Sequence, residues 1–403
     1  MRILVCPLDW GLGHATRCIP LIRALLENGH QVRIGAAGGG RSLLQAEFPA
    51  LDVFDFPGYR VRYSRSPALF LPVLLAQSPR VLAGLFAESR RLRRILSENP
   101  CDLIISDGRY GVHSSRVPTV FITHQVFIRI PARFPGAAFA ERLVLALNLR
   151  LLRRFVRVWV PDFPGSDSLS GDLSHKPCGL GNLEFIHPLS RFSGNRKVTG
   201  DPAVSGNPAS GVDVLAVVSG PEPQRGFFEG ALRKELGRMQ GTRVLVRGLP
   251  GAVEASGSAG GAPGSAGGAP GSAAGLGAIR PGGLTEFAHL SGEDLSRLFA
   301  GAGLIVARSG YTTVMELAGL GARAVVLVPT PGQSEQEYLA DHLERTGAGI
   351  RMEQDALDLP GAAERLRERE GFVRWKRESW RTRDGGPFSL TEFLADHPVL
   401  RTS

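Results

Sequence analysis

The sequence predicts an α/β protein made of two domains, each built around its own parallel sheet. Its 403 residues are too many for one ordinary domain, and 43% of them are hydrophobic, enough for substantial cores. Short apolar runs alternate with helical segments in both halves of the chain, which is typical of parallel sheets with crossover helices. A polar stretch rich in Gly, Pro and Ser, residues 193–211, separates the two series.

The N-terminal half opens like a Rossmann domain. Strands are expected at 2–6, 31–36, 102–106, 119–122 and 156–160, and helices at 18–28, 66–99 and 138–156. Gly11 and Gly13 let the loop after the first strand turn sharply, and Gly29 is a helix stop. Thr16 replaces the third glycine of a dinucleotide fingerprint, and Arg41 stands where an acidic ribose ligand would be sought, so no nicotinamide site is predicted.

The C-terminal half repeats the pattern. Strands are expected at 214–218, 243–247, 303–307 and 324–328, and helices at 227–236, at 312–320 and from about residue 334. Ser291 and Asp294 have the spacing of a helix cap. Residues 251–277 repeat Gly, Ala, Ser and Pro almost without charge, which predicts a disordered insertion. Trp375 and Trp380 are expected to dock the charged C-terminal segment.

Changes in composition along the chain indicate where the domains begin and end. We expect an N-terminal domain at 1–192, a linker at 193–212, a C-terminal domain at 213–380 and a tail at 381–403. Residues 1–191 carry 24 Lys and Arg against 14 Asp and Glu, a net charge of +10, whereas the remainder carries −1. The basic half suits an anionic membrane surface, an anionic acceptor or nucleic acid, and is equally explained by a solvated surface.

Composition also bounds the compartment. No apolar run reaches the ~20 residues of a membrane span, and the N-terminus leads into a strand. Cys6, Cys18, Cys101 and Cys178 lack disulfide or zinc spacing, so a cytoplasmic location is expected, with peripheral contact to the inner face of a membrane through the basic helices. A nucleic-acid partner is disfavoured, because the arginines are not interleaved with exposed aromatic residues.

Polar residues follow several predicted strands. In the N-terminal half, His14, Asp107, Arg109 and His124 come at strand ends, which share one edge of a parallel sheet where ligands bind. A histidine titrates near pH 6.5, which suits proton transfer at neutral pH. The alternative is that His14 has no catalytic role and only forms a hydrogen bond within its loop.

Two turns in the C-terminal half indicate an anion site. Ser309, Gly310 and Thr312 open a helix whose N–H groups can bind phosphate. The next strand is followed by amide and carboxylate side chains that suit the hydroxyls of a sugar: Gln333, Glu335, Gln336 and Glu337. Ser334 lies in the same turn. Each turn has an alternative explanation, since Thr313 with Glu316 and Ser334 with Glu337 are spaced as capping boxes. A third turn, SGPEPQR, offers Ser219, Gly220 and Arg225 to a diphosphate.

Four motifs together resemble the MurG-like branch of glycosyltransferase family 28, whose fold is GT-B. They are GLGHATR from Gly11, SGPEPQR from Ser219, RSGYTTVMELA from Arg308 and PTPGQSEQEYLA from Pro329. The segments LIISDGRYG, FITHQ and LSGDLSH also resemble an uncharacterised bacterial subgroup. The glycine loop is poorer in glycine than that of the peptidoglycan enzyme of this branch.

The resemblance implies two Rossmann-like domains facing an interdomain cleft, with a UDP-sugar on the C-terminal domain. By position, Ser219, Ser309 and Gly310 would contact the diphosphate, Glu316 the ribose, and Gln336 with Glu337 the hexose. The acceptor would lie on the N-terminal domain, on the side of Gly11, Gly13, Arg17, Arg109 and His124. Arg225 is added to the diphosphate site on charge alone.

The function predicted is transfer of a hexose, N-acetylglucosamine by analogy, from a UDP-sugar to an acceptor hydroxyl with inversion. His14 is the first choice of base and Asp107 the second. No Asp-x-Asp motif is present, so we expect no metal and no cofactor, the UDP-sugar being a substrate. The acceptor is expected to be lipid-linked or an envelope glycan. A UDP-sugar 2-epimerase and a non-catalytic UDP-sugar-binding protein are the alternatives.

Overall fold

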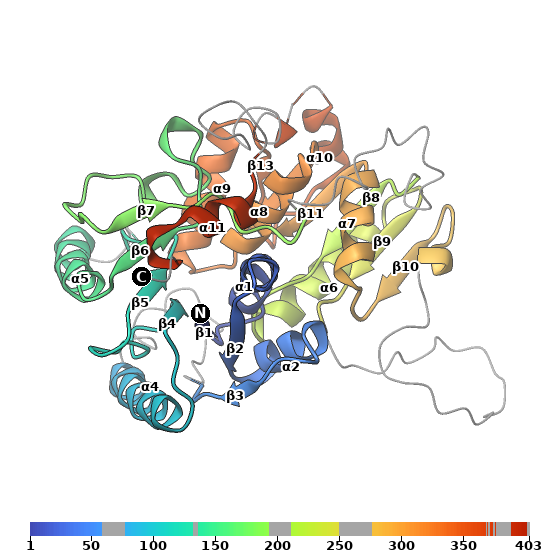
Figure 1. Cartoon of the computed structure of the whole chain (residues 1–403). Coiled ribbons are helices and arrows are strands. Elements are labelled where there is room, and N and C mark those ends of the chain that lie inside the picture. Colours follow the sequence, from blue (N-terminus) through green and yellow to red (C-terminus); the bar gives the residue numbers. More distant parts are fainter. Residues whose placement is uncertain are drawn as a thin grey trace.

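The computed structural model contains two parallel α/β units, one from each half of the chain (Figure 1). It describes residues 1–58, 77–131, 136–192, 211–249, 276–367, 369, 371–373, 375 and 388–400. Most of the predicted insertion at 251–277, most of the linker and Trp380 therefore lie outside the described residues. The last two residues of the predicted insertion are described and begin the short 3-10 helix η5, Leu276–Ala278. The predicted α/β fold class with two Rossmann-like parallel sheets is confirmed.

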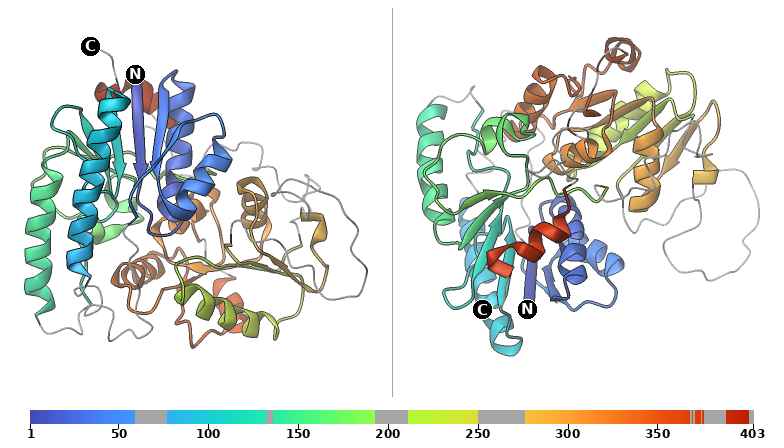
Figure 2. Two further views of the ribbon diagram at one scale, coloured as in Figure 1. Left: turned by 90° about the horizontal axis from the view of Figure 1, so that it is seen from below. Right: turned by 45° about the horizontal axis from the view of Figure 1, so that its top comes forward.

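The N-terminal sheet has seven parallel strands in the order β3-β2-β1-β4-β5-β6-β7. Its strands are β1 Arg2–Pro7, β2 Gln31–Ala36, β3 Val53–Asp55, β4 Leu103–Asp107, β5 Thr119–Ile122, β6 Arg157–Val160 and β7 Leu183–Phe185. Its helices are α1 Gly13–Glu27, α2 Gly38–Glu47, α4 Ser78–Glu98 and α5 Ala137–Leu152. Strands are added to one side of β1 up to β3 and to its other side from β4 onward. The helices α1 and α2 therefore cover one face of the sheet, and α4 and α5 cover the other (Figure 2).

Apolar side chains on both faces of this sheet form the core. Ile3 and Val5 of β1 pack with Ile19 and Ile22 of α1, and all four are almost fully buried. Alternate residues of the same strand, such as Leu4, pack toward α4 on the other face. Continuous burial along β1 explains why its sequence is an unbroken apolar run rather than an alternating one.

The C-terminal sheet has six parallel strands in the order β10-β9-β8-β11-β12-β13. Its strands are β8 Val214–Val217, β9 Arg243–Val246, β10 Leu284–Phe287, β11 Leu304–Arg308, β12 Val325–Val328 and β13 Ile350–Arg351. Its helices are α6 Gln224–Leu236, α7 Gly292–Gly301, α8 Tyr311–Leu320, α9 Ser334–Arg345 and α10 Leu359–Leu366. The predicted cap of α7 is confirmed, since the Asp294 N–H donates to Ser291 Oγ at 3.1 Å.

The helix α1 begins five residues earlier than predicted, at Gly13 instead of residue 18. Gly11 has a φ of +75° and makes the turn, as its sequence context predicts. Gly13 is the first helical residue, and its lack of a side chain allows Thr312 to pack closely against it instead of making a turn. Helix α2 and strands β3, β7 and β13 had no clear sequence signal, because the strands are two or three residues long and α2 begins with three glycines.

The C-terminal segment returns to the N-terminal unit. Trp375 is buried and its Nε1 donates to the Asp167 carbonyl at 2.6 Å. Helix α11, Leu390–Asp396, packs on α1, where Asn28 Nδ2 donates to the Thr391 carbonyl at 2.8 Å. Among the described residues, no helix has the length and apolar character needed to cross a membrane. Helix α11 joins the C-terminal segment to helix α1 of the N-terminal unit.

Candidate functional site

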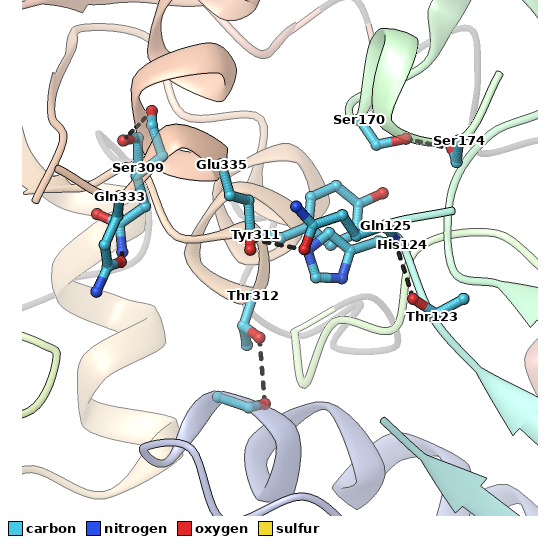
Figure 3. Close-up of polar contacts among 12 residues, drawn as sticks. Thr123, His124, Gln125, Ser170, Ser174, Ser309, Tyr311, Thr312, Gln333 and Glu335 are labelled. Carbon is cyan, nitrogen blue, oxygen red and sulfur yellow. Dashed lines mark hydrogen bonds and ion pairs between the residues drawn. The ribbon is translucent and has the colours of Figure 1, made fainter. Parts of the chain in front are cut away.

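Residues that follow the strands of one sheet contact residues that follow the strands of the other sheet at the domain boundary. Thr312, at the start of α8, donates from Oγ1 to the Gly13 carbonyl of α1 at 3.1 Å. Glu335 of α9 accepts a hydrogen bond from Nε2 of His124, which follows β5, at 2.8 Å. Figure 3 shows both contacts bridging the boundary. Residues predicted as donor-side and acceptor-side are thus in direct contact.

Arg17 on α1 organises the N-terminal side of this site. Its side chain is only 2% exposed, and it binds both carboxylate oxygens of Asp107, with Nε at 2.8 Å from Oδ2. The same guanidinium lies 3.0 Å from His14 Nδ1 and 3.1 Å from His124 Nδ1. One arginine therefore fixes the carboxylate and both imidazoles, which makes it a positioning residue.

The hydrogen-bond inventory assigns the tautomer of His124. A guanidinium only donates, so His124 Nδ1 accepts from Arg17 and the ring proton sits on Nε2, which donates to Glu335. His14 Nδ1 faces two groups, Arg17 and the Asp107 carboxylate at 3.2 Å. Nδ1 does not accept from Arg17 and donate to Asp107 at the same time, so the two contacts correspond to two tautomers. The tautomer that donates to Asp107 leaves His14 Nε2 as an acceptor, the form that a general base requires.

Burial and charge set the ionisation of this cluster. Burial lowers the pKa of His14, and the charge of Arg17 lowers it further, outweighing the opposite effect of Asp107. His14 is therefore neutral at neutral pH. Burial would raise the pKa of Asp107, but Arg17 and His14 hold it well below its usual range. Burial would also raise the pKa of the Glu335 carboxyl, but His124, His14 and Arg17 together lower it.

This geometry favours His14 over Asp107, the second choice of base in the sequence prediction. Its carboxylate is fully buried, clamped by Arg17, and depressed in pKa, so it is a weak proton acceptor. Its place next to His14 Nδ1 suits it instead to orient the imidazole. Of the two predicted bases, only His14 is partly exposed, at 19% of its side chain.

Tyr311 also joins the domains, and sequence inspection gave it no role. Its ring stacks on that of His124, with centroids 4.2 Å apart and planes 4° from parallel. Its hydroxyl donates to the Pro161 carbonyl at 2.8 Å. The side chain is 2% exposed, so the first residue of α8 is anchored in the N-terminal unit.

A second contact between the domains involves the LSGDLSH segment. The Asp172 N–H donates to Tyr338 Oη at 2.7 Å, and His342 Nε2 lies 2.9 Å from the Ser168 carbonyl. Gly171 has a φ of +49°, and a Cβ there would lie 2.5 Å from Tyr338 Oη. This segment therefore fits closely against α9, whose first turn carries Glu335.

The turns of the C-terminal sheet are held by their own side chains. Ser309 is fully buried, and its Oγ donates to the Gln336 carbonyl at 2.8 Å. The Gln336 amide accepts from the Thr330 N–H at 2.9 Å and donates to Gln333 Oε1 at 2.7 Å. Gly310 precedes α8, so the first N–H groups of that helix have no partner within it. The side chains shape the turns, and helix-start N–H groups remain for a ligand.

Neither predicted capping box forms. Helix α8 is capped by Gly310 and α9 by Gln333, in both cases without a side-chain cap bond. Glu316 instead pairs with Arg191 Nε at 2.7 Å, and Glu337 accepts from the Gly332 N–H at 3.0 Å. The capping explanation of these glutamates is therefore wrong, because the N-cap of α8 lies three residues before Thr313 and the N-cap of α9 one residue before Ser334.

Two of the predicted arginines form ion pairs with carboxylates of the protein itself. Arg225 binds Glu222 at 2.6 Å and Glu229 at 2.5 Å, so its charge is already neutralised. Arg109 is fully buried and pairs with Glu88 at 2.6 Å, beneath the acceptor-side loops instead of facing a ligand. Ser219 is half-buried at the end of β8, beside Gly220 with a φ of +105°.

Glu335 and Arg308 are the site residues that sequence reasoning undervalued. Glu335 lay within the polar cluster after Gly332 but had no partner that sequence could identify. Arg308 ends an apolar strand, and its charge at the end of a buried run is the signal that could have singled it out. No group of three or more His, Cys, Asp or Glu in the described ranges could hold a metal ion.

Comparison with protein families agrees with this architecture. Residues 288–369 match the glycosyltransferase family 28 C-terminal domain. An uncharacterised glycosyltransferase of Methanosarcina acetivorans is 23% identical over 366 residues, 87% of this chain and 85% of the relative. The UDP-N-acetylglucosamine–N-acetylmuramyl-(pentapeptide) pyrophosphoryl-undecaprenol N-acetylglucosamine transferase of Vibrio cholerae is 30% identical over 173 residues, 42% of this chain. The chain spans about half the length of that transferase and of another Methanosarcina acetivorans relative.

Solved structures align along nearly the whole chain. The glycosyltransferase SsfS6 of Streptomyces sp. SF2575, complexed with thymidine diphosphate, superimposes with a TM-score of 0.54 at 14% identity, covering 94% of both chains. The predicted resemblance is confirmed to this extent: residues 288–369 match the family 28 C-terminal domain, and the whole chain has the GT-B fold of solved glycosyltransferases.

Proposed function

We propose that this chain, with its family 28 C-terminal domain on a GT-B fold, moves a hexose from a UDP-sugar to an acceptor hydroxyl with inversion. The observation that carries the proposal is the meeting of two sets of strand ends, where Glu335 bonds His124 and Thr312 bonds the helix that bears His14. N-acetylglucosamine is the proposed hexose, because the Vibrio cholerae relative is named for its transfer from UDP-N-acetylglucosamine.

The donor is proposed to lie against the C-terminal turns. The diphosphate accepts hydrogen bonds from the N–H groups at the start of α8, next to Gly310, where the helix dipole also favours an anion. Glu316, oriented by its ion pair with Arg191, accepts hydrogen bonds from the ribose hydroxyls. Gln336 and Glu337 face the hexose. This arrangement stabilises charge on the leaving diphosphate by fixed dipoles, so the proposed reaction needs no metal.

The acceptor is proposed to enter on the N-terminal side, within reach of His14. His14 Nε2 takes the hydroxyl proton while the acceptor oxygen bonds to the anomeric carbon. The bond from that carbon to the phosphate oxygen breaks, and its electron pair leaves with UDP. The imidazolium that forms stays beside the Asp107 carboxylate, 3.2 Å from Nδ1, which stabilises its charge.

The proposal is tested by incubating the protein with UDP-hexoses and a lipid extract, following UDP release and labelled product. Acceptor-dependent UDP release with a glycosylated product is expected. Release of a free, epimerised sugar without an acceptor would identify a UDP-sugar 2-epimerase instead. UDP-sugar binding without any UDP release would identify a non-catalytic binding protein.

We propose a lipid-linked or envelope acceptor at the cytoplasmic face of a membrane.

Exposed apolar residues on α4 and α5 support contact with that membrane. Both helices cover the same face of the N-terminal sheet (Figures 1 and 2). Leu82 and Phe86 of α4 are 56% and 76% exposed, and Phe139, Leu143 and Leu147 of α5 are 58–74% exposed. Exposed arginines follow at the C-terminal end of each helix, at 90, 93 and 94 and at 150, 153 and 154. An apolar surface flanked by arginines suits an anionic bilayer.

Vesicle sedimentation tests this contact. The protein is expected to bind vesicles that contain anionic lipid more than neutral vesicles. The double variant F86S/L143S should lose most of this binding, whereas F227S, which alters an exposed phenylalanine on α6, should not. Equal binding by F86S/L143S and the unmodified chain would contradict membrane contact through this surface.

A further inference from the structure

Arg308 is a buried cation at the centre of the three donor-side loops. It ends β11 and is 1% exposed. Its Nη1 donates to the Pro329 carbonyl at 2.9 Å, and its Nη2 donates to the Gln224 carbonyl at 3.2 Å and to Gln354 Oε1. Its guanidinium carbon lies 4.0 Å from the centre of the Phe228 ring.

These contacts join loops that are distant in sequence. Gln224 lies within the SGPEPQR turn and begins α6, and Pro329 opens the loop that leads to α9. Arg308 itself is followed by the Ser309–Gly310 turn. The same three loops carry the proposed diphosphate and hexose contacts. One side chain therefore sets the spacing of the segments that would surround the donor.

The charge of Arg308 differs from that of its neighbour Arg225. Arg225 is neutralised by Glu222 and Glu229, whereas every hydrogen-bond acceptor of Arg308 given above is a neutral carbonyl or amide. In the described part of the chain, Arg308 Nε has no hydrogen-bond partner and the guanidinium has no carboxylate within ion-pair distance. Burial lowers the pKa of Arg308 to about 9, so the side chain is still charged at neutral pH.

A buried charge without a counter-ion is costly, and an anionic ligand nearby offsets that cost. Helix-start N–H groups at α6 and α8 already make these strand ends electropositive. We propose that Arg308 is a positioning residue that assembles the three donor loops, and that its uncompensated charge attracts the diphosphate bound above it and stabilises the leaving UDP. This inference rests on the proposed function.

The isosteric variant Q354E tests the charge directly. It places a carboxylate beside the guanidinium without changing side-chain size, so the fold should be retained. We expect the affinity for UDP, measured by titration calorimetry, to fall about tenfold while the affinity for uridine stays the same. R308Q should show the same selective loss together with lower thermal stability. R297Q, which removes an exposed arginine of α7, is the control and should lower both affinities by less than twofold.

The outcomes are distinguishable. An unmodified chain that binds UDP, together with a Q354E variant that binds it equally well, would overturn the role of Arg308. Equal losses for UDP and uridine in Q354E would also overturn it, because a purely structural change does not discriminate by phosphate. An unmodified chain with no affinity for UDP would instead overturn the proposed function itself.

Discussion

Glu335 of the C-terminal unit and His124 of the N-terminal unit form a hydrogen bond of 2.8 Å across the domain boundary. Through His124 Nδ1 this contact continues to Arg17, and from Arg17 to Asp107 and His14. The first turn of α9, next to the proposed hexose position, is thus linked to the proposed base by three consecutive polar contacts. Changes on the donor side can therefore alter the position of the base without touching it.

Replacing the base should affect turnover and not donor binding. We expect H14A to lower kcat by roughly 10²–10⁴, the usual contribution of a general base, with the dissociation constant of UDP changed less than twofold. H30A is the matched control, because His30 precedes β2 at the opposite edge of the sheet and should leave turnover unchanged. Loss of UDP affinity in H14A equal to its loss of kcat would mean that His14 only shapes the loop.

The pH profile should report the lowered pKa of His14. A base must be neutral, so the rate falls as the pH drops through the pKa of His14. Burial and Arg17 hold that pKa below its ordinary value of 6.5. The acid limb of kcat/KM is therefore expected below pH 6.5, and it should disappear in H14Q. A limb at or above pH 6.5, or one that persists in H14Q, would contradict this assignment.

The contact between Glu335 and His124 should stabilise the joined domains. E335A is expected to lower the free energy of unfolding by about 1.5–3 kcal/mol, the range for hydrogen bonds to charged groups, and E335Q by less because it keeps the acceptor. E344A in the last turn of α9 is the control. A double-mutant cycle with H124A, followed by thermal unfolding, should give a coupling of about 0.5 kcal/mol or more. Strict additivity would show that the contact contributes nothing.

Gly13 is expected to be required for the close approach of α8. A Cβ at this position would lie 2.9 Å from Thr312 Oγ1 and 3.5 Å from its Cβ. G13A should therefore reduce thermal stability, and adding T312A should restore much of it, because removing Oγ1 leaves only an ordinary contact. G29A is unsuitable as a control, since Gly29 has a φ of +74°. Gly230, with nothing within 4 Å of an added Cβ, serves in G230A. No recovery in G13A/T312A would contradict the packing argument.

The regular elements were predictable because they depend on local pattern. The strands at 31–36 and 119–122 have the predicted bounds, and Gly29 and Gly321 have the positive φ that helix ends require. Helix starts were predicted less well, since Gly13 and Gln224 begin helices several residues before the apolar periodicity does. A helix start is set by the loop before it and by what packs against it, and neither is visible in the apolar spacing.

The sequence by itself determined the two parallel sheets, their separation, and the strand ends that carry His14, His124 and the polar turns. Hydrophobic periodicity and glycine positions are properties of neighbouring residues, so they can be read along the chain. Only the tertiary structure decided which charges meet. Arg225 and Arg308 look alike in sequence, yet one is neutralised by two glutamates and the other is buried among neutral carbonyls. The electrostatic role of a side chain depends on distances across elements that the order of residues does not fix.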